Sequence, residues 1–167
     1  MTMTKKKNIV FAIAGLVILI GAIVAVAIFN RPVIAVSSEK TEYGQTGYFA
    51  VSAKGFEDII GSEFSIAFDS DVIKIMEITN GSVLSSVSVS EEDYANSNGR
   101  IEVMYLDYSG GDKPIKMDGD VLYVRYEVIK PLNCKLSLED VKFVDSSMEY
   151  MDSFRVKDGK IKTNAVH

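Results

Sequence analysis

The feature that most constrains the fold is an alternation of apolar residues with polar or small ones, in short runs. It is clearest between Gly47 and Ile78, where two runs follow one another: Phe49, Val51 and Ala53, then Phe64, Ile66 and Phe68. A period of two is typical of half-buried β-strands. No helical periodicity and no long internal repeat accompany it. The pattern therefore predicts an all-β chain, specifically an antiparallel sandwich.

We expect nine strands in the sandwich, separated by polar turns. The expected strand regions are 33–38, 46–53, 62–69, 72–79, 83–90, 100–106, 121–130, a run around Leu136 and Leu138 followed by a short run at 141–144, and 154–162. Residues 54–61 are expected to form a connector, 91–99 a turn-rich loop and 107–120 an irregular stretch. On the strand at 121–130 the inward set is Leu122, Val124, Tyr126 and Val128.

The N-terminal segment from Asn8 to Phe29 has 22 residues without a charge, which is enough to cross a bilayer as a helix. Three lysines precede it and only Arg31 follows closely, so the positive-inside bias puts the N-terminus in the cytoplasm. The expected organisation is a basic cytoplasmic tail (1–7), a single transmembrane signal-anchor (8–29), a linker (30–32), an extracellular sandwich (33–163) and a short tail (164–167). A signal peptide cleaved after Ala27 is the alternative.

Charge and composition exclude several classes of function. Beyond residue 29 the chain has 15 basic and 23 acidic residues, a net charge of −8, which argues against nucleic acid or anionic lipid as a partner. The single histidine is His167 and the single cysteine is Cys134, so neither a Ser-His or Cys-His pair in the core nor a His/Cys metal cluster is expected. No tryptophan is present to stack on sugars. We therefore expect a protein that is not an enzyme and needs no cofactor.

Two pairs of aspartates are weak candidates for a calcium site. They are Asp69 with Asp71, and Asp118 with Asp120. Their carboxylates suit calcium, but the spacing is far from that of an EF-hand loop. Aspartate is also favoured at turns for its own backbone hydrogen bonds, and both pairs fall at expected turns. The turn interpretation is preferred, and no metal is predicted.

Five motifs occur in an order that resembles one family. They are GFEDIIG followed by FSIAFD and DVIKI (55–75), GRIEVMYLDYSG (99–110), DGDVLYVRYEV (118–128), VKFVDSS (141–147) and VKDGKI (156–161). Over about 130 residues, a normal domain length, this order resembles the cohesin domain, the β-sandwich receptor module of cellulosome scaffoldins. The proline common in the turn before the fourth strand is replaced by Ser70-Asp71. The resemblance implies a jelly-roll sandwich with nine strands.

The resemblance also implies a partner and a binding face. Cohesins bind dockerin-bearing proteins, often carbohydrate-active enzymes, on a flat sheet face that matches the strands at 62–69, 83–90 and 100–106, and the dockerin holds the calcium. The positions it assigns to this face are Gly61, Glu63, Tyr94, Leu106, Asp107, Tyr108, Ser109 and Gly110. Some cohesins have asparagine where Gly61 stands. Without the resemblance, Glu63 and Asp107 are ordinary solvated carboxylates at strand ends.

Two other functions remain open from the sequence. A glycan-binding module of similar architecture needs a flat row of exposed aromatic residues, for which Tyr94, Tyr105, Tyr108 and Tyr123 are candidates; a polysaccharide is then the partner. A structural subunit of a surface complex needs an unprotected edge strand, for which residues 83–90 are the candidate.

Overall fold

The computed structural model describes residues 31–84, 87–109 and 111–164, and the compact unit begins at Pro32. The predicted transmembrane segment, with Asn8 and Phe29 at its ends, lies outside these residues. Within the described ranges, no helix has the length and apolar character needed to cross a membrane.

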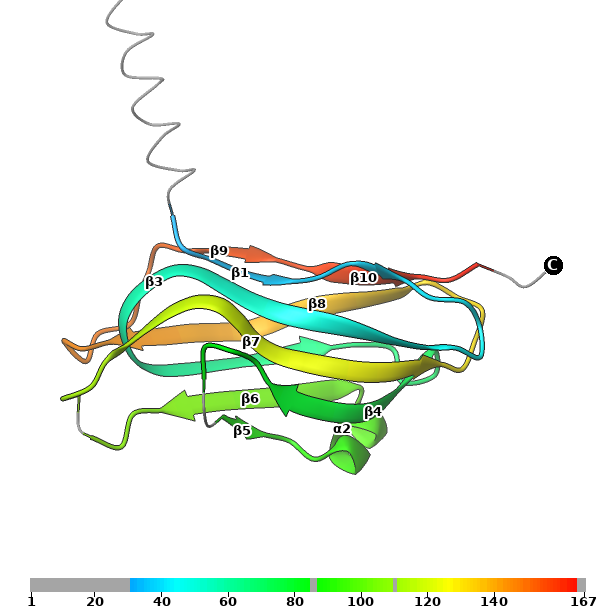
Figure 1. Cartoon of the computed structure of the whole chain (residues 1–167), viewed down its shortest axis with the longest axis horizontal. Coiled ribbons are helices and arrows are strands. Elements are labelled where there is room, and N and C mark those ends of the chain that lie inside the picture. The colour runs from blue at the N-terminus through cyan, green and yellow to red at the C-terminus, as the bar shows by residue number, and fades with distance from the viewer. Residues whose placement is uncertain (1–30, 85–86, 110, 165–167) are drawn as a thin grey trace, which may run out of the picture. The chain divides into compact units, whose positions relative to one another are not determined.

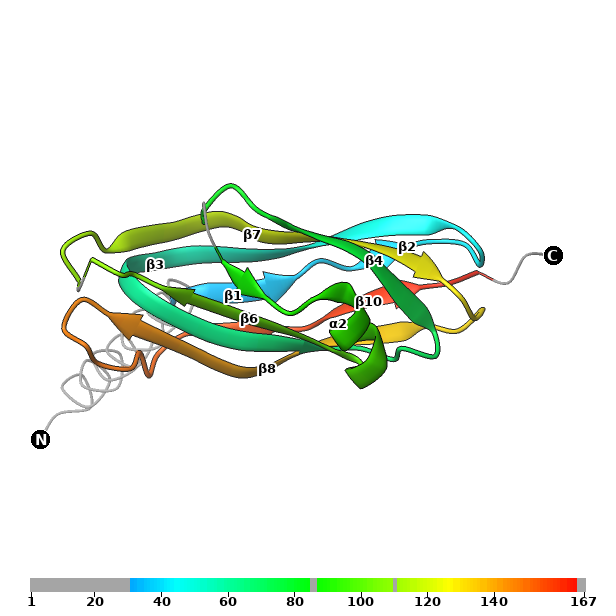
Figure 2. The same ribbon diagram turned by 90° about the horizontal axis from the view of Figure 1, so that it is seen from below.

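The described chain forms a sandwich of two sheet layers that share strand β3 (Figures 1 and 2). One layer has the order β4 (Ile73–Asn80), β7 (Ile115–Val128), β3 (Thr46–Ala67), β1 (Val33–Val36) and β9 (Arg155–Lys157). The other has the order β5 (Ser88–Val89), β6 (Arg100–Leu106), β3, β8 (Cys134–Asp145), β10 (Gly159–Lys162) and β2 (Glu39–Lys40). The predicted β-sandwich is confirmed, although ten strands rather than nine occur in the described ranges, and the pairs β1–β9 and β10–β2 are parallel.

Strand β3 corrects the predicted connector at 54–61. Residues 46–59 pair with β7 and residues 61–67 with β6, so the chain turns from one layer into the other without leaving the sheet, as Figure 2 shows. The turn is made through register shifts on both sides of Phe56 and through positive φ angles at Gly55 and Asp58. Phe56 is fully buried and stacks on Phe143 with ring centroids 4.0 Å apart. A buried aromatic residue in the middle of the segment explains why it is a bulged strand and not a solvated loop.

Three further boundaries differ from prediction. Strand β7 begins at Ile115, inside the stretch predicted to be irregular, because Met117 there is fully buried. The run at 141–144 is not separate, since β8 is continuous from Cys134 to Asp145. Of the strand predicted at 83–90, the described part forms only the two residues of β5.

The predicted loop at 91–99 is in fact helix α2 (Glu92–Asn98), which ends at Gly99 in the left-handed conformation. The helix closes an open sheet edge. The Asn96 side chain accepts from the backbone N–H of Ile75 at 2.7 Å and donates to the Ile75 carbonyl at 2.8 Å, as a neighbouring strand would. The Glu92 carboxylate accepts from the N–H of Ile78. These contacts satisfy backbone groups that would otherwise leave β4 as an unprotected edge.

The core lies between the two layers and confirms the predicted alternation. Leu122, Val124, Tyr126 and Val128 of β7 are fully buried, as predicted. Burial of each such side chain contributes roughly 1.5–3 kcal/mol relative to exposure. The buried hydroxyl of Tyr126 is hydrogen-bonded to that of Thr41 at 2.6 Å, and burial raises the pKa of Tyr126.

Candidate functional site

The outer surface of β6, β3 and β8 is the candidate site, and we call it the β6–β3–β8 face. Phe64 and Ile66 of β3 point into the core, so Glu63 and Ser65, which alternate with them, lie on the outer side of the sheet, where Glu63 is exposed and Ser65 is covered by its neighbours. The sheet register sets three outward rows across the three strands. They are Leu106, Gly61 and Val144; Met104, Glu63 and Lys142; and Glu102, Ser65 and Glu139.

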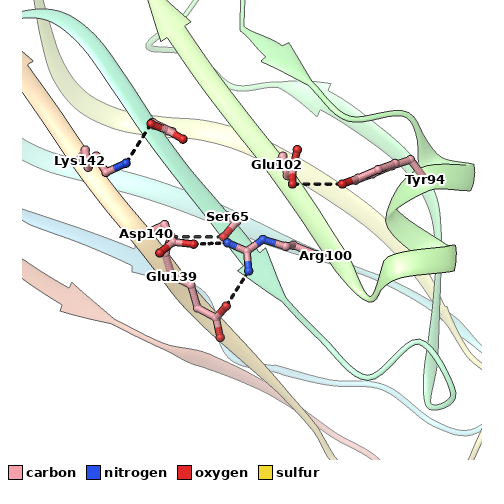
Figure 3. A network of polar contacts seen from close by, with 8 residues as sticks. Ser65, Tyr94, Arg100, Glu102, Glu139, Asp140 and Lys142 are labelled. Carbon is pink, nitrogen blue, oxygen red and sulfur yellow. Dashed lines mark hydrogen bonds and ion pairs between the residues drawn. The ribbon is translucent and has the colours of Figure 1, made fainter.

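Charged groups on this face are paired with one another (Figure 3). Lys142 donates to the Glu63 carboxylate at 3.3 Å across β3 and β8. Arg100 bridges to Glu139 at 2.9 Å and also contacts Asp140. The side chains of these partners are 31% to 66% exposed, so each pair contributes at most about 1 kcal/mol to folding. Their main effect is to give the face a fixed pattern of charge.

Tyr94 of helix α2 borders the face on the β6 side. Its hydroxyl donates to the Glu102 carboxylate at 3.2 Å, as the sticks in Figure 3 show. This hydrogen bond, together with the negative charge of Glu102, raises the pKa of Tyr94. The tyrosine thereby orients Glu102 on the outer surface of β6.

Exposed apolar side chains gather at the other end of the face. Met104 is 50% exposed, Leu106 51% and Tyr150 68%. With Gly61, Val144 and their neighbours, these residues line a shallow, mostly apolar hollow of about 140 Å³, which we call the apolar hollow. An apolar patch bordered by the Glu63–Lys142 ion pair has the make-up of a protein–protein interface.

Asp107, which the resemblance assigns to the binding face, makes several hydrogen bonds within the loop that follows β6. One of its carboxylate oxygens accepts from the N–H of Ser109 at 2.9 Å, and the other accepts from the Ser109 hydroxyl at 2.6 Å and from the N–H of Gly111 at 3.2 Å. These donors lower the pKa of Asp107. The carboxylate thus organises the loop after β6, which leaves the Tyr108 side chain 89% exposed. Gly110, also assigned to the site, lies outside the described residues.

The structure therefore brings together part of the predicted site. Gly61, Glu63 and Leu106 are neighbours on the face, and Tyr94 touches its border. The sequence analysis did not assign Glu102 and Met104, although the alternation in RIEVMYL places both beside Leu106 on one side of the strand. It also missed what β8 and the turn after it contribute: Glu139, Asp140, Lys142, Val144 and Tyr150. The assignment considered only the strands at 62–69, 83–90 and 100–106, and β8 lies beside the first of them through long-range pairing.

Three of the four candidate calcium ligands, Asp69, Asp71 and Asp120, have other partners. The Asp69 carboxylate accepts from the N–H of Asp71, and Asp71 pairs with Lys130 at 3.2 Å. Asp120 accepts from the Tyr123 hydroxyl at 2.5 Å. In the ranges that the structure describes, no three histidine, cysteine, aspartate or glutamate side chains are placed to hold a metal ion. Asp69 is thus a turn residue, as the preferred interpretation has it.

The four tyrosines of the glycan-binding alternative do not form one row. Tyr123 lies on β7 in the other layer, whereas Tyr94 lies on α2 and Tyr108 in the loop after β6. Tyr105 alternates with the outward residues of β6 and packs against the core. In the described part of the edge-strand candidate, β5 is paired with β6 along one of its two sides.

A β-sandwich with exposed apolar side chains beside paired charges on one sheet face has the features of a protein-binding module. Residues 33–162 match the sequence model of the cohesin domain, a non-catalytic binding module, and this chain belongs to that family. The family match confirms the resemblance found in the motifs.

Solved structures agree with this assignment. The cohesin of the OlpA–Doc918 complex, a type I cohesin–dockerin complex from Clostridium thermocellum, superposes with a TM-score of 0.70 at 26% identity, covering 80% of this chain and 99% of that one. A non-cellulosomal cohesin from the archaeon Archaeoglobus fulgidus gives 0.67 at 16% identity, covering 81% and 92%. The cohesin of the OlpC–Doc435 complex from Clostridium thermocellum gives 0.71 at 16% identity, covering 81% and 95%. No curated protein matches the chain.

Proposed function

We propose that this chain captures a dockerin-bearing protein on the β6–β3–β8 face. The observation that carries the proposal is the face itself, where exposed Met104, Leu106 and Tyr150 adjoin the Glu63–Lys142 ion pair. Membership of the cohesin family supplies the partner class, and the similar OlpA cohesin was solved in complex with a dockerin.

The mechanism is docking without chemistry. A partner helix laid on the flat face buries the exposed apolar side chains, and the paired charges around them set its orientation. Glu63 and Glu139 already have cationic partners on the face, so docking does not leave these two charges buried and unpaired. Calcium belongs to the dockerin in this scheme, and the cargo is a carbohydrate-active enzyme.

A capture experiment tests the proposed partner. The full chain, solubilised in detergent, is immobilised and exposed to the host's secreted proteins with and without EDTA. We expect it to retain a dockerin-bearing protein, to lose it in EDTA, and to lose most of it in Leu106→Ala/Glu63→Ala. The matched control is Tyr48→Ala, an equally exposed position on β3 in the other layer. Recovery of no dockerin, or equal losses in both variants, would contradict the proposal.

The location proposed for the domain is the cell surface, where the segment from Asn8 to Phe29 anchors it as a single-pass helix. The support is the length of this uncharged segment and the three lysines before it. Protease added to intact cells is expected to remove the domain and leave a short membrane-bound fragment that begins at the original N-terminus. A mature protein that begins after Ala27, with no membrane-bound fragment, would show that the segment is a cleaved signal peptide.

A further inference from the structure

A second hollow on the β6–β3–β8 face differs from the apolar one in the charges around it. It measures about 370 Å³, lies over β3, β5 and β6 beside the bulge of β8, and is lined by both apolar and charged residues. Three carboxylates line it, those of Glu63, Glu102 and Asp140, against the single guanidinium of Arg100. We call it the acidic hollow.

Two of these carboxylates already have a cation. Glu63 pairs with Lys142 and Asp140 with Arg100. The second contact depends on a bulge in β8, where the register with β3 shifts between Glu63 and Ser65 and Asp140 takes a φ of +53°. The bulge lets Glu139 and Asp140 reach the same guanidinium.

Glu102 is the carboxylate left without a cation. None of the ion pairs formed by the described residues includes it, and its carboxylate accepts a hydrogen bond from the neutral hydroxyl of Tyr94. Figure 3 shows the two side chains reaching toward each other from β6 and α2, away from the ion pairs. The acidic hollow therefore has an excess of negative charge, with one oriented carboxylate to receive a positive group.

The two hollows lie one after the other along the strands, and Glu63 and Met104 line both. Leu106 lines the apolar hollow and Glu102 the acidic one. They are four residues apart on β6, which is about 13 Å in a strand. Residues seven or eight apart lie on one side of a helix, and at about 1.5 Å per residue they are roughly 10–12 Å apart along its axis. Two side chains about two turns apart on one helix can therefore reach both hollows.

Building on the proposed function, we propose that the docking helix of the partner carries a lysine or arginine that enters the acidic hollow and pairs with Glu102, and an aliphatic residue about two turns away that enters the apolar hollow. The basic residue is proposed because its charge complements that of Glu102. The aliphatic residue is proposed because the apolar hollow exposes apolar surface. The direction of the helix on the face is then fixed, because the reverse orientation places the aliphatic residue among carboxylates and the cation against Leu106. Glu102 becomes the residue that determines which dockerins bind.

The test measures affinity for the dockerin recovered by the capture experiment, using the full chain in detergent at several salt concentrations. Glu102→Gln keeps the size of the side chain and removes the charge. We expect it to weaken binding about tenfold and to reduce the loss of affinity that added salt causes, since a charge-assisted pair is lost. Leu106→Ala is expected to weaken binding with the salt dependence unchanged. The matched control is Glu127→Gln, an outward position on β7 in the other layer, which should leave both quantities unchanged.

A charge exchange identifies the partner residue. Glu102→Lys should abolish binding of the wild-type dockerin and recover it when the matching basic residue of the dockerin is replaced by glutamate. Suppose that Glu102→Gln binds with the affinity and salt dependence of the wild type while Leu106→Ala loses binding. The dockerin then binds the β6–β3–β8 face, but the proposed role of the acidic hollow is wrong. If the wild-type chain binds no dockerin, the proposed function itself is wrong.

Discussion

At the scale of single residues, Gly47 shows how tightly one position can be determined by its neighbours. A Cβ added there would meet the Thr41 hydroxyl oxygen and the Tyr126 hydroxyl at 2.6 Å each, within the buried hydrogen bond between them. We expect Gly47→Ala to lower the free energy of unfolding by about 1–3 kcal/mol, because overpacking displaces or breaks that bond. Urea denaturation followed by tyrosine fluorescence measures it.

Gly61→Ala is the control for Gly47→Ala on the same strand. Its Cβ would find ordinary contacts at 3.7–3.8 Å, and its φ is not positive. The stability of this variant should lie within about 0.5 kcal/mol of the wild type. An equal loss in both variants would show that β3 does not tolerate alanine at glycine positions in general, and that the Thr41–Tyr126 pair is not the cause.

Asp107 gives a prediction for pH. Its pKa is lowered in the folded protein by hydrogen bonds from Ser109 and the N–H of Gly111. Its contribution to stability is therefore present above the usual carboxyl pKa and is lost as the pH falls through the lowered value. Asp107→Asn should lower the melting temperature at pH 7, and the difference from wild type should shrink as the medium is made strongly acidic. A difference that stays constant with pH would mean that the charge does not hold the loop.

At the scale of elements, helix α2 protects the edge of β4 chiefly through the Asn96 side chain, which makes two of the three hydrogen bonds described between them. Asn96→Ala would leave both the N–H and the carbonyl of Ile75 without their partner. We expect a loss of about 1–3 kcal/mol in the free energy of unfolding and faster hydrogen exchange at the Ile75 amide. Asn98→Ala, which removes only an exposed contact to the Tyr94 carbonyl, should leave both nearly unchanged. Equal effects of the two substitutions would argue that helix stability, not edge protection, is responsible.

Elements with clear alternation could be predicted from the sequence, and those determined by distant contacts could not. Strand β6 is found with its predicted ends, because RIEVMYL alternates without interruption between two turn signals. Helix α2 was missed because its seven residues are too few for a periodic pattern and are rich in asparagine, serine and aspartate, which favour turns. It is held by the β4 edge, which sequence spacing does not reveal.

The same reasoning applies to the site. The positions on β6 follow from alternation, so Leu106 could be placed, and Glu102 with it. The charge pattern depends on β8 lying beside β3, some 75 residues earlier in the chain, and on a bulge that turns Asp140 toward Arg100. Neither follows from local sequence, so Lys142 and Asp140 were missed.

At the scale of the whole molecule, β3 should make the two layers unfold together. Residues 46–59 belong to one layer and 61–67 to the other, and the fully buried Phe56 occupies the turn between them. The substitution Phe56→Ala opens a cavity against Phe143 and should lower the free energy of unfolding by about 3–5 kcal/mol. Because no loop separates the layers at this point, we expect Phe56→Ala to unfold in one transition, shifted to lower urea, with far-ultraviolet circular dichroism and tyrosine fluorescence coinciding.

Phe154→Ala is the matched control, since Phe154 touches the same two rings from a partly buried position near the edge of the core. Phe154→Ala should lower the free energy of unfolding by less than Phe56→Ala does, and it should also unfold in a single transition. If Phe56→Ala instead separates the two signals, one layer keeps its structure while the other unfolds, and β3 does not couple them. The stability of the β6–β3–β8 face would then depend only on its own layer. If β3 couples the two layers, Phe56→Ala also weakens dockerin binding under conditions where the variant is partly unfolded. The loss of binding is then proportional to the unfolded fraction.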